Sequence, residues 1–547
     1  MVDAPEDVLT RVEEDDRPVA TSRRDELRRW LIQPSSLAVV AVVVLALAVG
    51  IYLRARFYSS IEPGPDSDEA EMGLLGQQLL NGEFPLLMRN QPYAGTPWLF
   101  VIATSIRAFG MGELGLRTPI VLLGVLNAVL CMFVARTIGW SWARSAATAA
   151  VSWCYPIAAV FFASRETMYF VPAITMGLLT VLIVLRADVA AGDASVIGGV
   201  ARSRWLMLAA GFAAGIGWWV NPGSLYLSGP AFAWVAFRAL RSPVEPLVWT
   251  RRVVQVLRAA LPAAVGFAVG AYPWIFVTAL GPSRRNNYAD RPNDDVLSRV
   301  KLFFTEQIPG FTGFKAPLGA LERGAWLGGW PWVVGAVALG GLLVVQVVRR
   351  PRGHRETIVT FLGAGVFVVF LFLTSQTGAI YANLRYVFFA APVFPLLVAA
   401  RWRNDLAAFG ALAVLPVVAL LGALTWQAAP PSDIQPAVDL LESRGDTCVI
   451  GDYWAGGHRL MYASDGRIVA VSTYENRNPL YVDQAEDRGN CPWIFFDGQS
   501  AASAFEDHLE SNDIGYTTER PGGGVVLYFP DQRVWVDDVP PQVRTAS

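Results

Sequence analysis

The sequence predicts an α-helical polytopic membrane protein with about 11 transmembrane helices, followed by a C-terminal extracytoplasmic α/β domain. Three observations carry this prediction. Of the 547 residues, 53% are hydrophobic and only 16% are charged, whereas soluble domains carry roughly 25% charge. The apolar residues gather in long runs, and arginines fill alternate connections between these runs. From residue 431 the composition turns polar, which indicates a separate domain outside the membrane.

Residues 1–35 are predicted to form a cytoplasmic N-terminal tail. This segment is acidic and then basic, with four arginines between positions 23 and 29. The first apolar run follows at 36–53, and its 18 residues are enough to cross a hydrocarbon core of about 30 Å. We interpret it as a signal anchor whose N-terminus stays inside, without a cleavable signal peptide.

The later apolar runs and the arginines between them give the predicted topology. Ten runs follow the first, at 118–135, 145–162, 168–185, 205–220, 224–237, 259–280, 328–348, 357–374, 386–400 and 405–427. Arginine is retained in short cytoplasmic loops, so alternate connections should be rich in arginine. Five of them are, and they hold Arg136 and Arg144; Arg186, Arg202 and Arg204; Arg238, Arg241, Arg251, Arg252 and Arg258; Arg349, Arg350, Arg352 and Arg355; and Arg401 and Arg403. The transmembrane domain is therefore predicted over 36–427, with the main outward segments at 54–117, near 281–325 and after 426.

One short apolar stretch, Thr96–Phe109, is interrupted by Arg107. If it were a span, the arginines between 349 and 355 would lie outside, against the arginine rule. We therefore predict a helix in or against the membrane interface, with an ordinary span as the alternative.

The C-terminal segment 431–547 is predicted to be a small extracytoplasmic α/β domain, because short apolar runs alternate with helix-like stretches. The strand-like runs are Thr447–Ile450, Arg467–Val471, Trp493–Phe496 and Gly524–Phe529. The helix-like stretches are Pro436–Glu442, Gly457–Tyr462 and Ser503–Glu510. Cys448 and Cys491 each precede or open a predicted strand, and an outward compartment permits a disulfide. A Cys448–Cys491 bridge and two reduced, buried cysteines both remain open at this point.

The same domain contains Gly451-Asp452-Tyr453-Trp454. This segment bears a superficial likeness to the Trp-Trp-Asp-Tyr-Gly signature of oligosaccharyltransferases, but the residue order differs and the leading tryptophan pair is missing. We predict instead a turn from a strand to a helix, with Asp452 near the start of the helix.

Charged residues gather at the outward ends of the predicted spans. The first outward loop holds Pro65-Asp66-Ser67-Asp68-Glu69-Ala70 near its start, just before an amphipathic helix that ends at Gly82. The next outward turn holds the neighbours Arg165 and Glu166, and Arg385-Tyr386 opens a late span from the outward side. These charged residues could instead have a structural role. In that interpretation the acids complement a helix dipole, or the charges form ion pairs at the ends of spans. An arginine at the outer end of a span requires an anion, such as a phosphate, a carboxylate or a lipid head group.

The acidic pair Asp68-Glu69, followed by the pattern Gly-x-x-Gly-x-x-Leu-Leu-x-Gly that begins at Gly73, resembles the first external loop of glycosyltransferases with the C-type membrane fold. Within that superfamily the chain resembles protein O-mannosyltransferases and lipid A aminoarabinose transferases. The Arg117-Thr118-Pro119 turn and the Arg385-Tyr386 pair also match this family. The resemblance covers about residues 36–400, and it implies a donor in which a sugar is linked to a polyprenyl monophosphate.

The resemblance also implies roles for individual residues. Asp68 matches the catalytic acid of the family, Glu69 its neighbour, and Glu166 a second acidic residue in the second external loop. Arg385 matches a basic residue of a late span, and we expect Arg385, Tyr386, Arg165, Lys301 and Lys315 to bind the donor phosphate. Aminoarabinose transferases have Lys-Pro where this chain has Thr96-Pro97, so the phosphate ligand stays open, with Arg89, Arg284 and Arg285 as further candidates.

These residue types suit glycosyl transfer. A polyprenyl phosphate is already a good leaving group, so the site needs a base for the acceptor hydroxyl and cations for the phosphate. We predict Asp68 as this general base, and displacement at the anomeric carbon with inversion. No cluster of histidines or cysteines has metal-ligand spacing, so no metal site is predicted and no cofactor is certain; a divalent cation on Asp68 and Glu166 is left open.

We therefore predict a multi-pass glycosyltransferase, transferring a hexose or pentose, in the plasma membrane of a bacterium. The expected partners are the lipid-linked sugar donor, a glycan, lipid or protein acceptor of the cell envelope, and membrane lipids. A net charge of −2 gives no reason to expect nucleic acid. The alternatives are a transporter or lipid flippase, and a scaffold without catalytic activity that presents the C-terminal domain. Intramembrane charges would favour a transporter, whereas here the charges gather at outward span ends.

Overall fold

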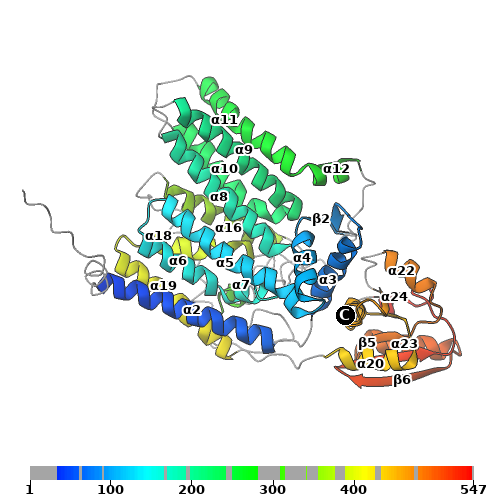
Figure 1. The fold of residues 1–547 in the computed structure, drawn as a ribbon. Helices are drawn as coiled ribbons and strands as arrows, with labels where there is room; N and C mark the ends of the chain where they lie inside the picture. Colours follow the sequence, from blue (N-terminus) through cyan, green and yellow to red (C-terminus); the bar gives the residue numbers. More distant parts are fainter. Residues whose placement is uncertain are drawn as a thin grey trace, which may run out of the picture.

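A computed structural model describes residues 34–60, 65–88, 91–165, 169–192, 197–241, 249–280, 308–313, 341, 355–375, 388–425, 433–473 and 479–544. Within these ranges, long helices form a bundle, and a smaller domain with a β-sheet lies at one end of it, beside helix α3 (Ser67–Leu80) (Figure 1). The predicted combination of a helical membrane domain and a C-terminal sheet domain is confirmed.

Four of the described helices are long and apolar enough to cross a membrane. They are α2 (Pro34–Ser60), α5 (Glu113–Thr137), α8 (Phe170–Gly192) and α19 (Asp405–Thr425). A fifth span is added if α11 (Trp249–Gly270) and α12 (Tyr272–Leu280) are taken as one, although a 66° bend separates them. The predicted number of 11 spans is therefore not confirmed, since the described residues account for four or five.

Several predicted spans are shorter or broken helices. The run 145–162 is divided into α6 (Trp142–Cys154) and α7 (Ile157–Phe162) around Pro156. The remaining helices in this part of the chain are α9 (Ile197–Val220), α10 (Leu225–Arg241), α14 (Ile308–Thr312), α16 (Thr357–Ser375) and α18 (Val393–Arg401). Almost all of the predicted run 328–348 lies outside the described residues.

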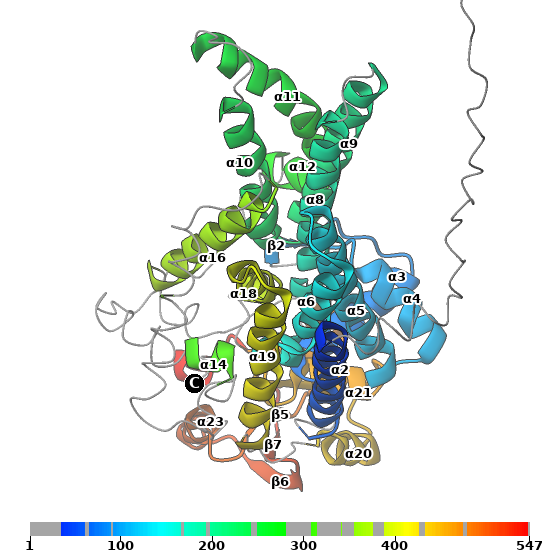
Figure 2. The same cartoon turned by 90° about the vertical axis from the view of Figure 1, so that its left-hand side faces the viewer.

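Close helix packing in the bundle depends on small residues. Helix α2 packs against α6 and α19, which runs beside it in Figure 2, and α9 packs against both α8 and α11. At the contact of α9 and α11, Gly211 and Gly215 of α9 lie against the backbone of α11, and Gly266 and Gly270 of α11 lie against the backbone of α9. Both helices thus present a Gly-x-x-x-Gly motif to the other, which lets two backbones approach without side chains between them.

The segment between α2 and α5, which was predicted as the first outward loop, is folded onto the bundle. It contains α3, a short hairpin of β1 (Leu87–Met88) and β2 (Gln91–Gly95), and α4 (Leu99–Phe109). Helix α4 packs against α3 and α5, so the apolar stretch that was predicted as an interfacial helix is helical. Its position relative to the membrane stays a prediction.

The C-terminal domain is built on a five-stranded sheet in the order β4-β3-β5-β7-β6. Strand β3 (Cys448–Gly451) pairs in parallel with β4 (Val469–Ser472) and β5 (Trp493–Phe496), while β7 (Val525–Pro530) is antiparallel to β5 and to β6 (Tyr516–Gly522). The helices are α20 (Gln435–Arg444), α21 (Gly457–Ala463), α22 (Pro479–Glu486), α23 (Ser500–Ser511) and the short α24 (Pro541–Arg544). All four predicted strands and all three predicted helices are present, whereas β6, α22 and the short α24 were missed.

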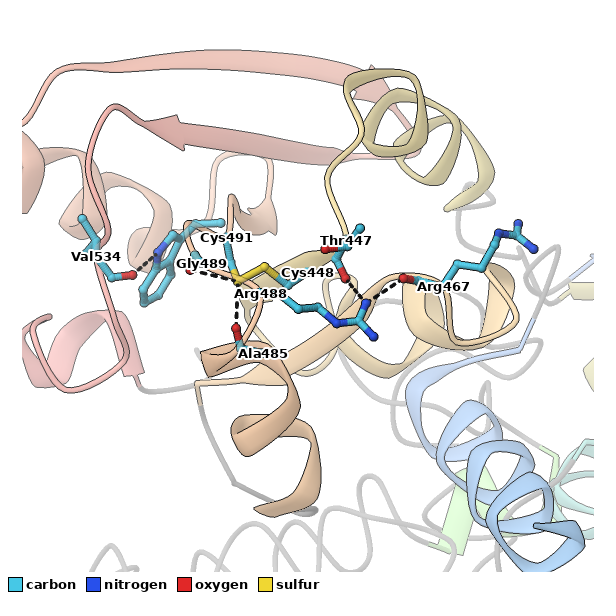
Figure 3. Close-up of a disulfide and its surroundings, with 9 residues drawn as sticks. Thr447, Cys448, Arg467, Ala485, Arg488, Gly489, Cys491 and Val534 are labelled. Atoms are coloured by element: carbon cyan, nitrogen blue, oxygen red, sulfur yellow. Dashed lines mark hydrogen bonds between the residues drawn. A yellow bond between two sulfur atoms is a disulfide. The ribbon is translucent and has the colours of Figure 1, made fainter.

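Cys448 and Cys491 form a disulfide, which resolves the alternative left open by the sequence. The register of β3 and β5 explains why they meet. Ile450 pairs with Trp493, an offset of 43 residues, and the two cysteines are separated by the same 43 residues, with their Cα atoms 5.2 Å apart. Figure 3 shows Arg488 beside the bridge, where Nη1 donates hydrogen bonds to the carbonyls of Thr447 (2.6 Å) and Arg467 (2.9 Å).

The contact of α9 and α11 gives a first test. We expect Gly266→Ala to lower the melting temperature of the purified protein, because the new methyl group would meet the carbonyl of Leu208 and the amide of Phe212. Overpacking of this kind costs roughly 1–3 kcal/mol.

Gly410→Ala in α19 is the matched control. A methyl group added at this position would point into open space, with no neighbouring atom within 4 Å, and alanine is favoured over glycine in a helix by up to about 1 kcal/mol. Equal melting temperatures for the two variants would show that α9 and α11 are not packed through these glycines.

Candidate functional site

Helix α3 begins with a capping box that concentrates acidic groups in its first turn. Asp66 is the N-cap, and its Oδ1 accepts a hydrogen bond from the amide of Glu69 at 2.8 Å. In return, Oε2 of Glu69 accepts from the amide of Asp66 at 3.2 Å. This reciprocal arrangement satisfies two helix-end donors, and the helix dipole favours carboxylates at this position. Asp68 and Glu71 lie in the same part of the helix, and both are buried.

The carboxylate of Glu69 is held by two arginines from the bundle. Arg117 of α5 donates to it from Nε at 3.0 Å and from Nη2 at 2.9 Å, a two-pronged geometry that suits a guanidinium. Arg165, which follows α7, donates from Nη2 to Glu69 at 3.3 Å and to Asp66 at 2.9 Å. The side chain of Glu69 is 0% exposed and that of Arg117 is 4% exposed, so this ion pair is shielded from water.

The carboxylate of Asp68 faces a different neighbour, the C-terminal domain. The hydroxyl of Tyr453 donates a hydrogen bond to Oδ1 of Asp68 at 2.9 Å. The hydroxyl of Ser67 donates to the backbone carbonyl of Tyr453 at 2.6 Å. Tyr453 is 1% exposed and Asp68 is 6% exposed. Two adjacent residues at the start of α3 are therefore bonded to one residue that lies 385 positions later in the chain.

Further along α3, the same face continues to contact the C-terminal domain. Oε2 of Glu71 contacts Nδ1 of His458 on α21. The ring of His458 packs edge-on against the rings of Tyr453 and Tyr481, with centroids 5.1 and 5.5 Å away. Nε2 of Gln78 then donates to the hydroxyl of Tyr481 at 2.9 Å. Contacts of this kind extend over most of the length of α3.

Two more contacts join α21 to the segment between α2 and α5. Nε of Arg459 donates to the carbonyl of Pro65 at 3.1 Å. The amide of Gly112, which precedes α5, donates to the hydroxyl of Tyr462 at 2.8 Å. The ring of Tyr462 lies against Gly73 of α3, where a larger side chain would collide with it. Burial raises the pKa of Tyr462, so its hydroxyl keeps its proton at neutral pH.

The predicted turn after β3 is confirmed, and it carries a residue that the sequence did not single out. Oδ1 of Asp452 accepts hydrogen bonds from the amides of Trp454 (2.8 Å) and Ala455 (3.0 Å), which closes the turn. The neighbouring Tyr453 points to Asp68. Tyr453, His458 and Glu71 were missed, because no local pattern relates residues of α3 to residues of a domain that lies nearly 400 positions later.

The structure brings together three of the residues predicted to form the site, Asp68, Glu69 and Arg165. Arg165, predicted to bind the donor phosphate, contacts Asp66 and Glu69 here. Thr96, which replaces the lysine of the resembled family, donates from its hydroxyl to the carbonyl of Leu86 at 3.2 Å. The other predicted residues lie outside the described residues, and their roles stay predictions; they are Glu166, Lys301, Lys315, Arg385 and Tyr386, with Arg89, Arg284 and Arg285.

Metal binding is tested only in part. Among the residues that the structure describes, no group of three or more histidine, cysteine, aspartate or glutamate side chains could hold a metal ion. The cation site left open on Asp68 and Glu166 includes a residue outside the described ranges, so it stays untested.

Comparison with known proteins shows which solved structures share the fold of this chain. No protein-family model and no curated protein sequence matches the chain. Among solved structures, ArnT from Cupriavidus metallidurans bound to undecaprenyl phosphate matches with a TM-score of 0.54 at 15% identity, over 89% of this chain and 97% of ArnT. The apo state of the same protein matches with a TM-score of 0.55 at 14% identity, over 89% of this chain and 98% of ArnT.

A structure of the oligosaccharyltransferase AglB from Archaeoglobus fulgidus, in complex with an inhibitory peptide and a dolichol-phosphate, matches with a TM-score of 0.46 at 13% identity, over 92% of this chain and 75% of AglB. The two ArnT matches show that this chain shares the fold of ArnT over nearly its whole length. The C-type membrane fold predicted from the sequence is thereby confirmed.

The buried ion pair of Glu69 yields a second test. Glu69→Gln should lower the melting temperature strongly, because Arg117 and Arg165 would lose a buried counter-charge. Removing one partner of a buried ion pair costs roughly 3–5 kcal/mol.

Glu113→Gln is the control, since Glu113 also contacts Arg117, at 3.1 Å, but is 28% exposed. We expect a small change for this variant, because water solvates the remaining charge. If both variants lowered the melting temperature in detergent by the same amount, the buried ion pair of Glu69 with Arg117 and Arg165 would not be the main stabilising contact of this site.

Proposed function

We propose that this chain is a membrane glycosyltransferase that moves a sugar from a polyprenyl-monophosphate donor to an acceptor on the outer face of the membrane. The observation that carries the proposal is the buried carboxylate of Asp68, which Tyr453 holds by a hydrogen bond at one end of an ArnT-like bundle. An ArnT structure that shares the fold was solved with undecaprenyl phosphate, which supports a polyprenyl phosphate as the lipid part of the donor.

The proposed chemistry is a single displacement at the anomeric carbon. The carboxylate of Asp68 accepts the proton of the acceptor hydroxyl while the acceptor oxygen forms its bond to the anomeric carbon. The bond from that carbon to the phosphate oxygen breaks on the opposite side, and the polyprenyl phosphate leaves with the electron pair. Attack from the face opposite the leaving group inverts the configuration.

Cations are needed where negative charge develops on the leaving phosphate. We assign this role to Arg385, on the basis of the family resemblance, and to Lys301 and Lys315 as further cationic candidates. The hydroxyl of Tyr386 is proposed as an additional hydrogen-bond donor to the phosphate. Arg165, whose Nη2 donates to Asp66 and Glu69, is proposed as a further ligand of the phosphate. Glu166, which adjoins Arg165 in the chain, is proposed as a second acidic residue of the site.

Glu69 is assigned a supporting role rather than the role of the base. Two guanidinium groups contact its carboxylate, and opposite charges favour the ionised form of a carboxylate over the protonated form. A group held in this way is a poor proton acceptor, whereas it fixes the first turn of α3 and thereby the position of Asp68.

Asp68→Asn tests the base role directly. We expect transfer to fall by at least about 100-fold, since positioned general bases contribute roughly 10²–10⁴-fold. The asparagine still offers an oxygen to Tyr453, so the melting temperature should stay close to that of the unsubstituted protein. The assay would follow release of undecaprenyl phosphate from a panel of synthetic undecaprenyl-phosphate sugars in proteoliposomes with envelope extract as the acceptor.

Asp465→Asn provides the control, because Asp465 is 60% exposed and its ion-pair contact is with Arg467 of the C-terminal domain. If Asp68→Asn kept more than a tenth of the activity, Asp68 would not be the base. The unsubstituted protein could instead move the lipid-linked sugar across the bilayer without releasing undecaprenyl phosphate from any donor. That result would support the flippase alternative.

The proposed outward orientation has its own test. A cysteine placed at Asp465 should react with a membrane-impermeant maleimide in intact cells, whereas one at Arg403, between α18 and α19, should react only after lysis. The free cysteines of the described part of the chain, Cys131 and Cys154, are buried, so background labelling should be low. The opposite labelling pattern would invert the topology and place Asp68 in the cytoplasm.

A further inference from the structure

Tyr453 links the C-terminal domain to the residue that we assign as the base. It lies on the turn between β3 and α21, and its hydroxyl donates to Oδ1 of Asp68 at 2.9 Å. A phenol that is 1% exposed and aimed at a carboxylate is a specific arrangement, because a buried hydroxyl requires a partner to offset its desolvation.

Both ends of Tyr453 are fixed. Its backbone carbonyl accepts from Ser67 at 2.6 Å, and the preceding Asp452 closes the turn through two backbone amides. Its ring packs edge-on against Trp454 and His458, with centroids 4.9 and 5.1 Å away. The phenol is therefore held in one orientation, and the hydrogen bond to Asp68 does not depend on a mobile side chain.

We propose that Tyr453 is a positioning residue for Asp68, so that the active site is completed by the C-terminal domain. This inference rests on the proposed role of Asp68 as the base. The phenol fixes one carboxylate oxygen and thereby the direction in which the carboxylate can accept a proton. Positioning matters because a displacement of about 1 Å in a reacting group can cost around 100-fold in rate.

A hydrogen bond donated to a carboxylate also stabilises its ionised form, which is the form that a base must have. Among the described residues, the charged and titratable groups near the first turn of α3 on the side of the bundle include Asp66, Glu69, Glu113, Arg117, Arg165 and Tyr58. On the side of the C-terminal domain they include His458, which contacts Glu71, together with Arg459 and Tyr462. A variant of Tyr453 leaves all of these in place, so its effect on pH dependence reports on the Tyr453–Asp68 bond.

The test is Tyr453→Phe, which removes the hydroxyl and keeps the ring. We expect kcat to fall about tenfold or more, since hydrogen bonds to charged groups are among the stronger ones, with little change in KM for the donor. The acidic limb of the kcat/KM profile should move to higher pH, because the ionised carboxylate loses a stabilising donor and ionises only in more alkaline solution.

Tyr481→Phe is the matched control. It removes a phenol hydroxyl from the same interface, but one that contacts Gln78 instead of Asp68. We expect it to lower the melting temperature about as much as Tyr453→Phe without moving the acidic limb. Ser67→Ala, which frees the carbonyl of Tyr453, provides a milder second variant with an expected smaller loss of kcat in the same direction.

The outcomes separate the two proposals. If Tyr453→Phe lowered stability but left kcat and the acidic limb unchanged, Tyr453 would be a docking residue only, and the positioning role would be overturned. If Asp68→Asn itself kept its activity, the base role would fail regardless of the result for Tyr453. Loss of activity in Asp68→Asn together with a shifted limb in Tyr453→Phe would support both.

Discussion

The structure depends on how four carboxylates are accommodated at the start of one helix. Asp66 is the N-cap of α3, and Asp68, Glu69 and Glu71 lie in its first turns. Glu69 and Glu71 are almost completely buried. Burying an ionised group is costly unless it is paired and hydrogen-bonded. The helix dipole and the capping box supply part of the compensation, and the rest has to come from neighbouring elements.

Helix geometry divides these acids between two neighbours. Successive residues of an α-helix point about 100° apart, so residues three or four positions apart share a face. Asp66 and Glu69 lie on one face and contact Arg165, with Arg117 also on Glu69. Asp68 and Glu71 lie on the next face and contact Tyr453 and His458 of the C-terminal domain. The helix is thus the element that the bundle and the C-terminal domain hold in common, and a change on either side is expected to reach Asp68.

The sequence predicted the parts of the molecule that are governed by local patterns. Hydropathy and the distribution of arginine gave the helical bundle, and short apolar runs gave four of the five strands of the C-terminal sheet. Strand β6 was missed because it is an exposed edge strand whose residues, Tyr516–Gly522, include Glu519, Arg520 and Pro521. The number of spans was not confirmed, partly because the run 145–162 looks continuous in hydropathy, whereas the helix is interrupted at Tyr155 and Pro156.

The sequence predicted only the part of the candidate site that lies in the segment between α2 and α5. Asp68 and Glu69 stand out as acids beside a helix pattern that resembles the family. That pattern does not indicate which carboxylate is buried against a distant residue that must offset the free-energy cost of its burial. The spacing of Ser67, Asp68, Glu71 and Gln78 on one side of α3 does indicate a polar face that needs a covering surface. The turn of Gly451-Asp452-Tyr453-Trp454 supplies part of that surface. Its sequence does not match the oligosaccharyltransferase signature, so the motif alone does not reveal this contact.

The division of the acids also explains why two adjacent carboxylates can have different roles. Glu69, at the third helical position, must close the capping box and therefore points to the arginines that neutralise it. Asp68 precedes it by one residue and is turned away from that pair by the geometry of the helix. Oδ1 of Asp68 accepts a hydrogen bond from the hydroxyl of Tyr453, which orients this carboxylate toward the C-terminal domain. A single helix turn thereby places a fixed structural anion beside an oriented one, and the second is the residue to which we assign the chemistry.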